Sequence, residues 1–286
     1  MSNGSPERLL GSNYLNLSSP YRMFKHFISN DNKIPTHWHD FFEMACIVSG
    51  AGTHVVNGQP FRIKPGMVFL LTTADFHELL ADEGETVELY NFIFDDSFIR
   101  PAIQEAIYGQ SRLFLHTFEG EPARRMEEEF ARIWEESQHM RFGNDIVVQG
   151  CLERIVIQLV RQLESDRADE REQERIRKDS MHPSIHKALL FIQHRFREPI
   201  TLAVAADYAG LSPNYFSECF RKQVGLSFQD YLNDKRLQFA SALLRSSDLP
   251  VTEVCYAAGY NTILHFDRLF KRKFGSSPRE YRKLRG

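Results

Sequence analysis

An internal repeat of about 50 residues near the C-terminal end constrains the fold of this chain more than any other feature. Ala209-Gly210 recurs as Ala258-Gly259, 49 residues later. Phe216, Phe220, Gly225 and Tyr231 recur as Phe266, Phe270, Gly275 and Tyr281, each 50 residues later. The duplication predicts two copies of one supersecondary unit, with one residue added in the turn of the second copy.

Each copy has the pattern of two helices joined by a tight turn. The first helix ends in Ala-Gly, and glycine adopts the positive φ with which a chain leaves a helix. We expect Ser212 and Asn261 to be the N-caps of the second helices, and Pro213 suits the first helical position in the first copy. Each second helix carries two phenylalanines four residues apart, which are expected to fix one of its sides to the core.

The opposite side of each second helix is polar and largely basic. It carries Asn214, Ser217, Glu218, Arg221 and Lys222 in the first copy and Thr262, Ile263, His265, Arg268, Lys271 and Arg272 in the second. A helix-turn-helix unit contacts base edges in the major groove with this side. We predict that these residues contact double-stranded DNA, and that Arg268 forms a bidentate contact with a guanine. The alternative is two ordinary helix pairs in an all-α bundle.

Charge is distributed unevenly along the chain. From Pro183 to Gly286 there are 16 Lys and Arg against 9 Asp and Glu, a net charge of +7, whereas the preceding residues have 19 against 29, a net charge of −10. A basic C-terminal part fits a phosphate-binding module. The acidic remainder indicates a part that does not bind DNA.

The chain is predicted to be a multidomain α+β protein. Seven helical segments separated by short turns are predicted at 184–197, 202–209, 213–223, 228–245, 251–258, 263–274 and 278–284, and the long segment 228–245 joins the two copies. Residues 165–182 are mostly charged or small and cannot form a core, so we expect a solvated helix or a flexible linker there. The predicted division is a first domain at 1–164, a linker at 165–182 and an all-α DNA-binding domain at 183–286.

Residues 32–94 predict an antiparallel β-sandwich or barrel. Short apolar or alternating runs at 44–48, 52–56 and 67–71 are separated by turns, and Asn57-Gly58 suits a type I′ turn because both residues tolerate positive φ. Two amphipathic helices are predicted to follow, at 121–139 and 144–164. The second is apolar over a wide arc, which favours a homodimer contact. A helix packed only on its own barrel is the equally weighted alternative.

The C-terminal third closely resembles the AraC/XylS transcription regulators. The matching motifs are Lys235-Arg236-Leu237-x-x-Ala240-x-x-Leu243-Leu244, Ala257-Ala258-Gly259-Tyr260, His265-Phe266-x-x-x-Phe270-Lys271 and Gly275-x-Ser277-Pro278-x-x-Tyr281. The resemblance implies base contacts at Asn214, Ser217 and Glu218 in the first unit and at Thr262, Ile263 and Arg268 in the second, and RNA polymerase as a partner. Glu218 stands where a basic residue is often found, and could accept a hydrogen bond from a cytosine amino group instead.

The N-terminal β-region resembles the two sequence motifs of the cupin barrel. The matching residues are His37-x-His39-x-x-x-Glu43 and Gly50, then Gly66 and, eleven residues later, His77. In metal-binding cupins the three matching histidines and the glutamate are ligands, a set that suits Mn, Fe, Ni or Zn. The chain departs from the motifs at Asp31, Thr72, Ala74 and Ala81, and similar sensor domains of AraC-type regulators commonly keep the His-rich stretch without a metal. We therefore expect no metal and no cofactor.

We assign His37, His39, Glu43 and His77 to the binding of a small polar effector. These side chains offer both donors and acceptors, which suits a polyhydroxylated ligand such as a carbohydrate or its derivative better than an apolar one. The expected function is a sequence-specific transcription regulator, an activator rather than an enzyme, that responds to this effector. A metal-dependent cupin enzyme with a DNA-binding tail and a ligand-independent regulator with a filled barrel are the alternatives.

The cellular location is predicted from what the sequence lacks. No apolar run approaches the roughly 20 residues of a membrane span, and the first residues have no signal-peptide pattern. We therefore expect a cytoplasmic protein without a membrane partner, and reduced thiols at the four dispersed cysteines.

Overall fold

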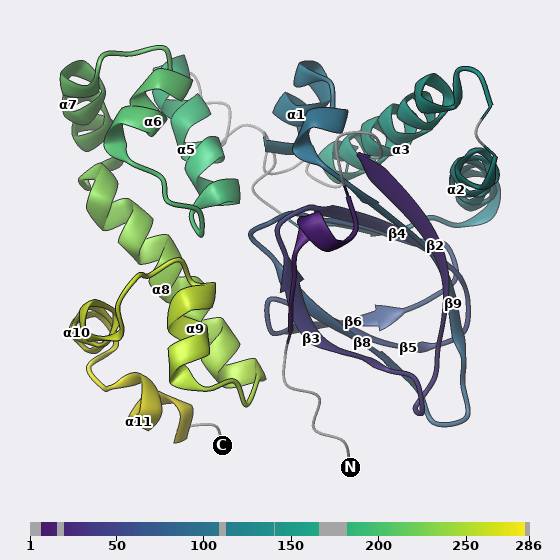
Figure 1. The fold of residues 1–286 in the computed structure, drawn as a ribbon, viewed down its shortest axis with the longest axis horizontal. Helices are drawn as coiled ribbons and strands as arrows, with labels where there is room; N and C mark the ends of the chain where they lie inside the picture. Colours follow the sequence, from purple (N-terminus) through teal and green to yellow (C-terminus); the bar gives the residue numbers. More distant parts are fainter. Residues whose placement is uncertain (1–6, 16–19, 109–112, 140, 166–181, 284–286) are drawn as a thin grey trace. The chain divides into compact units, whose positions relative to one another are not determined.

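The computed structural model describes residues 7–15, 20–108, 113–139, 141–165 and 182–283 (Figure 1). These residues form two compact units, one at 7–165 and the other at 182–283. Most of the predicted linker, residues 166–181, lies outside the described residues. In the described parts of the chain, no helix combines the length and the apolar character needed to cross a bilayer.

The N-terminal unit contains two sheets, each with five strands among the described residues (Figure 1). The strands are β1 (Glu7–Leu9), β2 (Tyr21–Ile28), β3 (Ile34–His39), β4 (Phe42–Ser49), β5 (Gly52–Val56), β6 (Gln59–Ile63), β7 (Met67–Leu71), β8 (Phe76–Ala81), β9 (Val87–Phe94) and β10 (Phe114–Thr117). One sheet has the order β1-β3-β8-β5-β6 and the other β10-β7-β4-β9-β2. Neighbouring strands pair antiparallel except β1 and β3, which run parallel. The predicted antiparallel β-sandwich or barrel is confirmed.

The turn at Asn57-Gly58 has the predicted geometry. Val56 pairs with Gln59, so the two residues between them form the whole connection of β5 to β6. Asn57 has φ 52° and Gly58 has φ 80°, the positive values at both positions that a type I′ turn requires. A type I′ turn is compatible with the right-handed twist of β-strands, which is why it suits a two-residue connection.

The sheet containing β4, β7 and β9 is covered on both faces. The helices α2 (Gly120–Gln138) and α3 (Asn144–Ser165) pack against each other, and α2 also contacts β2, β4 and β9 (Figure 1). All five residues of β7 are consequently buried. Its continuous apolar run is therefore the pattern of a strand between two layers. The helix α1 (Pro101–Tyr108) packs on α3.

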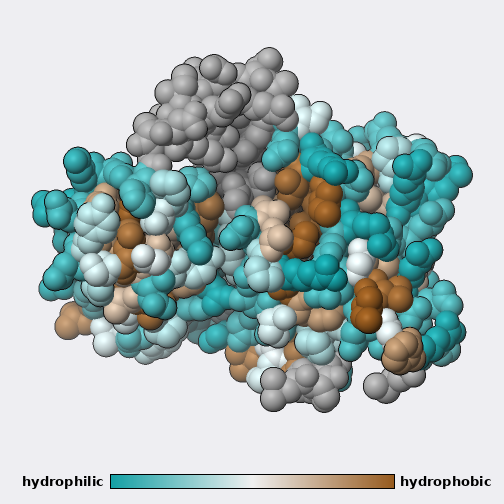
Figure 2. All heavy atoms as spheres, turned by 90° about the horizontal axis from the view of Figure 1, so that it is seen from above, coloured by the Kyte–Doolittle hydropathy of each residue, from teal (hydrophilic) through white to brown (hydrophobic). Residues whose placement is uncertain are grey.

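The helix α3 uses most of its wide apolar arc inside its own unit. Val148, Leu152, Ile155, Val156 and Leu159 are buried. Ile146 and Ile157 remain 70% and 37% exposed, respectively. Figure 2, which views the molecule from above Figure 1, shows apolar side chains gathered among polar ones on the face that carries α1, α2 and α3. Part of the apolar surface of α3 is therefore not covered by other residues of the same chain.

The C-terminal unit consists of seven helices in the described range 182–283, as predicted. They are α5 (Pro183–Arg195), α6 (Leu202–Tyr208), α7 (Pro213–Val224), α8 (Phe228–Ser246), α9 (Val251–Ala257), α10 (Ile263–Phe274) and α11 (Pro278–Lys283). Their ends lie within two residues of the predicted ends. The long α8 connects the two copies of the repeat, α6 with α7 and α9 with α10.

The turns of the two copies are built alike. Gly210 has φ 69° and Gly259 has φ 85°, the left-handed conformation that glycine adopts without strain. Ser212 is the N-cap of α7, as predicted, whereas the residue added in the second turn makes Thr262 rather than Asn261 the N-cap of α10. Neither the Ser212 nor the Thr262 side chain accepts a capping hydrogen bond from a backbone N–H group.

The phenylalanine pairs fix the second helices as predicted. Phe216, Phe220, Phe266 and Phe270 are fully buried. The ring centroids are 5.4 Å apart in the first pair and 5.5 Å apart in the second. Contacts between aromatic rings at this distance add to the free energy of burying them. Each second helix therefore has one side committed to the core and the other side free.

Candidate functional site

The free side of α7 carries the residues that the sequence assigned to it. Asn214, Ser217, Glu218, Arg221 and Lys222 are all exposed. They lie opposite the buried phenylalanine pair, and α7 ends where Gly225 takes φ 78°. The local sequence thus positions five polar side chains on one accessible surface.

The free side of α10 differs from the prediction in one detail. Thr262, His265, Arg268, Lys271 and Arg272 are exposed, as expected for residues that contact DNA. Ile263 is half-buried, because its side chain lies on the same side of α10 as Phe266. Leu264, which the sequence reasoning did not name, is 84% exposed. Counting backward from Phe266 would have identified Leu264 as the counterpart of Asn214.

A hydrogen bond orders part of this surface. The Arg268 guanidinium donates from Nη2 to Nδ1 of His265, 3.2 Å away and one turn earlier. Arg268 and Lys271 share this side of α10 with Arg272. Cationic side chains on an exposed helix face are electrostatically complementary to the phosphates beside a DNA groove.

The helix α8 is anchored inside the C-terminal unit by a buried arginine. Arg236 donates from Nε to the carbonyl oxygen of Phe196 at 2.6 Å and from Nη2 to that of Glu198 at 2.7 Å. Tyr260, whose ring centroid lies 5.7 Å from the Arg236 guanidinium carbon, donates its hydroxyl hydrogen to the Asn233 carbonyl oxygen at 3.3 Å. These bonds attach α8 to the connection between α5 and α6 on one side and to the turn between α9 and α10 on the other.

The four predicted effector residues come together between the two sheets of the N-terminal unit. His37 and His39 lie on β3, His77 on β8 and Glu43 on β4 of the other sheet. All four are buried. His37 is paired with His77 in the antiparallel register of β3 and β8, so that their side chains face the same interior.

Two hydrogen bonds set the tautomers of the β3 histidines. Nδ1 of His37 lies 2.9 Å from the Pro35 carbonyl oxygen, and Nδ1 of His39 lies 2.7 Å from that of Phe41. A carbonyl oxygen only accepts, so each Nδ1 carries the hydrogen and each Nε2 directs a lone pair inward. Oε2 of Glu43 is 3.4 Å from Nε2 of His39.

Comparison with known proteins identifies the family. Residues 26–178 match the AraC-like ligand binding domain family, and residues 205–284 match a helix-turn-helix domain family. The first match alone covers more than half of the 286 residues. The chain belongs to the AraC family of transcriptional regulators. As a member of this family it is a DNA-binding protein.

Relatives of this AraC-family regulator match it over most of their length. The HTH-type transcriptional activator RhaS of Escherichia fergusonii is 28% identical over 262 residues, 88% of each chain. RhaS of Escherichia coli O81 (strain ED1a) is 27% identical over 257 residues, again 88% of each chain. The solved C-terminal domain of AraT, a response regulator from Geobacillus stearothermophilus, is 33% identical, covers 36% of this chain and 87% of that one, and superposes with a TM-score of 0.35.

Burial favours the neutral forms of His39, His54 and His77 in the AraC-family regulator. Burial lowers the pKa of His39 to about 3, although the nearby Glu43 carboxylate opposes the shift. Burial also lowers the pKa values of His54 and His77 well below the ordinary value for histidine. Imidazoles in this state offer lone pairs and single N–H groups to a ligand, with no positive charge.

The sequence reasoning missed two polar residues of this cluster. Nε2 of His54, on β5, is 3.1 Å from Nδ1 of His77, and the Asn91 side-chain amide, on β9, donates to Oε1 of Glu43 at 3.2 Å. His54 lies between Gly52 and Val56 on an alternating strand. The alternation shows that β5 has a buried face and a more exposed face. Only the three-dimensional arrangement of the two sheets shows that the face with His54 is turned toward the effector cluster.

The donor set fits a divalent metal ion. One nitrogen each of His37 and His77 and one oxygen of Glu43 all lie within 4.8 Å of one another. Nε2 of His39 is buried with no hydrogen-bond partner and faces the same carboxylate. Histidine ligands of metals commonly donate their other ring N–H to a backbone carbonyl, as His37 and His39 do here.

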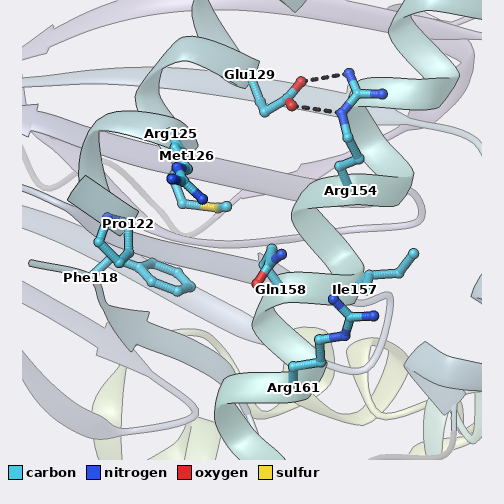
Figure 3. Close-up of a pocket in the computed structure, with 9 residues that line it drawn as sticks. All are labelled: Phe118, Pro122, Arg125, Met126, Glu129, Arg154, Ile157, Gln158 and Arg161. Atoms are coloured by element: carbon cyan, nitrogen blue, oxygen red, sulfur yellow. Dashed lines mark hydrogen bonds and ion pairs between the residues drawn. The ribbon is translucent and has the colours of Figure 1, made fainter.

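A separate groove of about 400 Å³ lies between α2 and α3 (Figure 3). Its lining combines apolar side chains, such as Phe118 and Met126, with the cationic Arg125 and Arg161. Arg154 donates two hydrogen bonds to Glu129, at 2.6 and 2.7 Å, and so joins the two helices. None of the predicted effector residues lines this groove.

Proposed function

We propose that this AraC-family regulator is a transcription activator that binds a specific DNA sequence with the exposed sides of α7 and α10. The observation that carries the proposal is the division of each helix into two sides. The phenylalanine pairs are fully buried, while the predicted contact residues other than Ile263 are exposed. A helix held in this way presents a fixed set of side chains to the major groove.

The proposed DNA contacts are the exposed residues of the two helices together with half-buried Ile263. In α7 these are Asn214, Ser217, Glu218, Arg221 and Lys222, and in the second unit Thr262, Ile263, His265, Arg268, Lys271 and Arg272. Arg268 suits a guanine because its guanidinium can donate to O6 and N7 together. Two recognition helices on one face of a duplex need a separation of about one helical turn, roughly 34 Å. Activation is supported by the names of the two full-length relatives.

We propose that the effector is a small polyhydroxylated molecule, a sugar or its derivative, bound at His37, His39, Glu43 and His77. The cluster combines lone pairs, N–H groups and a carboxylate in one buried place, which suits hydroxyl groups that both donate and accept. The Nε2 atoms of His37 and His77 are only 2.9 Å apart. A ligand that binds to either atom competes with the hydrogen bond between the two rings.

The same residues would hold a divalent ion, if one is present, through Nε2 of His37, His39 and His77 and the carboxylate of Glu43. Such an ion would supply a Lewis acid to which hydroxyl oxygens of the effector bind. The chain's own contribution is then the orientation of the three rings, which His54 and the carbonyl groups of Pro35 and Phe41 fix.

We further propose a homodimer that uses the uncovered side of α3, and RNA polymerase as the partner at promoters. Exposed Ile146 and Ile157 support the dimer, because a second copy that covers these apolar side chains would remove them from water. The proposed boundaries are a sensor and dimerisation domain at 1–164, a linker at 165–182 and the DNA-binding domain at 183–286. Coupling requires that the effector bind two arrangements of the dimer with different affinity.

Selection of bound sequences from a random DNA pool, with the full-length protein, tests the proposed function. We expect one sequence motif with two half-sites, and isothermal titration with a panel of sugars should show heat for at least one sugar with the native protein and none with His39→Ala. Recovery of no motif contradicts specific DNA binding. Absence of heat for every sugar contradicts the proposed effector class, and stoichiometric metal that is lost in His39→Ala establishes the ion.

A further inference from the structure

Leu264 is the second residue of α10, and its side chain is 84% exposed. Leucine is among the residues most often buried in folded proteins. The other exposed apolar side chains of the C-terminal unit, Val204, Tyr215, Leu226 and Tyr256, are exposed by 44% to 58%. Leu264 therefore stands out within its own unit, and nothing in the packing of α10 requires a leucine there.

The position of Leu264 on the helix is at the centre of the exposed side. With 3.6 residues per turn, the residues two before and two after Phe266 point away from it. These residues are Leu264 and Arg268, and they are neighbours one turn apart. Because Phe266 is fully buried, its opposite side is the part of α10 that projects farthest from the core.

The internal repeat shows that this position carries a different chemistry in each copy. Phe216 corresponds to Phe266, so Asn214 and Glu218 of α7 correspond to Leu264 and Arg268 of α10. Asn214 and Glu218 are likewise exposed. The two units thus present an amide and a carboxylate at one site, and an isobutyl group and a guanidinium at the other.

We propose that Leu264 determines specificity at one base pair by packing against the 5-methyl group of a thymine, next to the guanine that Arg268 contacts. In the major groove, thymine is the only base that offers a methyl group, and apolar side chains contact it there. This inference rests on the proposed DNA contacts of α10. Leu264 would distinguish a thymine from the other bases by its methyl group, which the polar residues of α10 are not proposed to do.

The charge around Leu264 favours DNA over a protein surface as its partner. Arg268, Lys271 and Arg272 share the exposed side of α10, and His265 precedes them. An apolar protein surface would have to desolvate these cations, which costs free energy unless each is paired. A DNA groove pairs them with phosphates while the leucine reaches the base edge.

The test compares thymine with deoxyuridine, which differs only by the methyl group, at each thymine of the selected site. Removing one buried methyl group costs about 0.8 kcal/mol, which corresponds to roughly four-fold weaker binding. We expect this loss at one thymine with the native protein and no loss there with Leu264→Ala. Asn214→Ala is the matched control, since it alters the corresponding position of α7 and should retain the four-fold effect.

Thermal unfolding of Leu264→Ala should match that of the native protein, because the side chain is not packed in the core. An equal deoxyuridine effect in Leu264→Ala and the native protein would overturn the inference, as would native binding that no thymine methyl affects. Unchanged DNA affinity of Leu264→Ala with a loss of transcription activation would also overturn it and indicate a protein contact. Failure to select any sequence would instead contradict the proposed function itself.

Discussion

Nε2 of His37 and Nε2 of His77 lie 2.9 Å apart in the interior of the N-terminal unit. Because His37 donates its Nδ1 hydrogen to a carbonyl group, the hydrogen between the two rings belongs to His77. Nδ1 of His77 then accepts from His54. The three rings form one chain of hydrogen bonds that links β3, β8 and β5, and any ligand at this place competes with that chain.

Acidification should destabilise the N-terminal unit. The folded-state pKa values of His39, His54 and His77 are lowered by burial, whereas the unfolded chain takes up these protons below about pH 6.5. The stabilisation that comes from keeping these histidines neutral is therefore fully present above this pH. It is lost as the pH falls toward the folded-state pKa values, by up to about 1.4 kcal/mol per pH unit for each histidine.

Urea unfolding at pH 7 and pH 5.5, in the presence of a chelator, measures this effect. Both tryptophans, Trp38 and Trp134, belong to the N-terminal unit, so that their fluorescence reports its unfolding. His54→Gln should reduce the loss of unfolding free energy between pH 7 and pH 5.5, because it removes one of the three histidines with a lowered pKa. Equal stability at the two pH values would contradict the neutral histidine cluster.

The two turn glycines should differ in their tolerance of alanine. A Cβ at Gly259 would lie 2.5 Å from the Arg197 carbonyl oxygen, whereas a Cβ at Gly210 would meet nothing within 4 Å. Gly210→Ala should cost about 1 to 2 kcal/mol because of its positive φ alone. Gly259→Ala should cost clearly more, since the Arg197 backbone must also move.

Thermal unfolding followed by the helical circular dichroism signal compares these two variants. The two positions are equivalent in the repeat, so each serves as the control of the other. An equal decrease in Tm would show that the close approach of Arg197 to the second turn has no energetic consequence.

Substitutions at two nearby positions of α10 should have different effects, one on the stability of the unit and the other on DNA binding. Phe266→Ala should lower the free energy of unfolding of the C-terminal unit by about 3 to 5 kcal/mol, because a fully buried ring is lost. Arg268→Ala should leave this free energy unchanged and weaken binding to the selected site by about 1 to 3 kcal/mol. If Arg268→Ala weakens binding to all sequences equally, Arg268 contacts a phosphate.

The proposed dimer should depend on the uncovered side of α3. Ile146→Glu and Ile157→Glu introduce charge at exposed apolar positions and should shift sedimentation at micromolar concentration from dimer to monomer. Phe27→Glu, at an exposed position of β2, is the control and should leave the dimer intact. A native protein that sediments only as a monomer would remove the dimer from the mechanism.

Local signals explain why most of the fold could be predicted from the sequence. Positive φ is available to Asn57, Gly58 and Gly259 at little cost, so the turns that contain them are visible in the sequence. The phenylalanine spacing likewise determines which side of α7 and α10 is buried. These features depend on residues within a few positions of one another.

The parts that could not be predicted depend on contacts between distant residues or on helix phase. His54 and Asn91 join the effector cluster only because β5 and β9 belong to facing sheets. The exposed Leu264 was not among the predicted contacts, because the residue added in the second turn obscures the phase of α10. Aligning the copies on their phenylalanines, rather than on Ala-Gly, resolves this phase.

Hydroxyl-radical footprinting of the selected DNA site tests the central claim most directly, that two recognition helices of one chain bind a single duplex. For each protomer we predict two protected segments about one helical turn apart, with Arg268→Ala weakening protection at one segment and Asn214→Ala at the other when the DNA is saturated with protein. A single protected segment, or weakening of the same segment in both variants at saturation, would contradict the account.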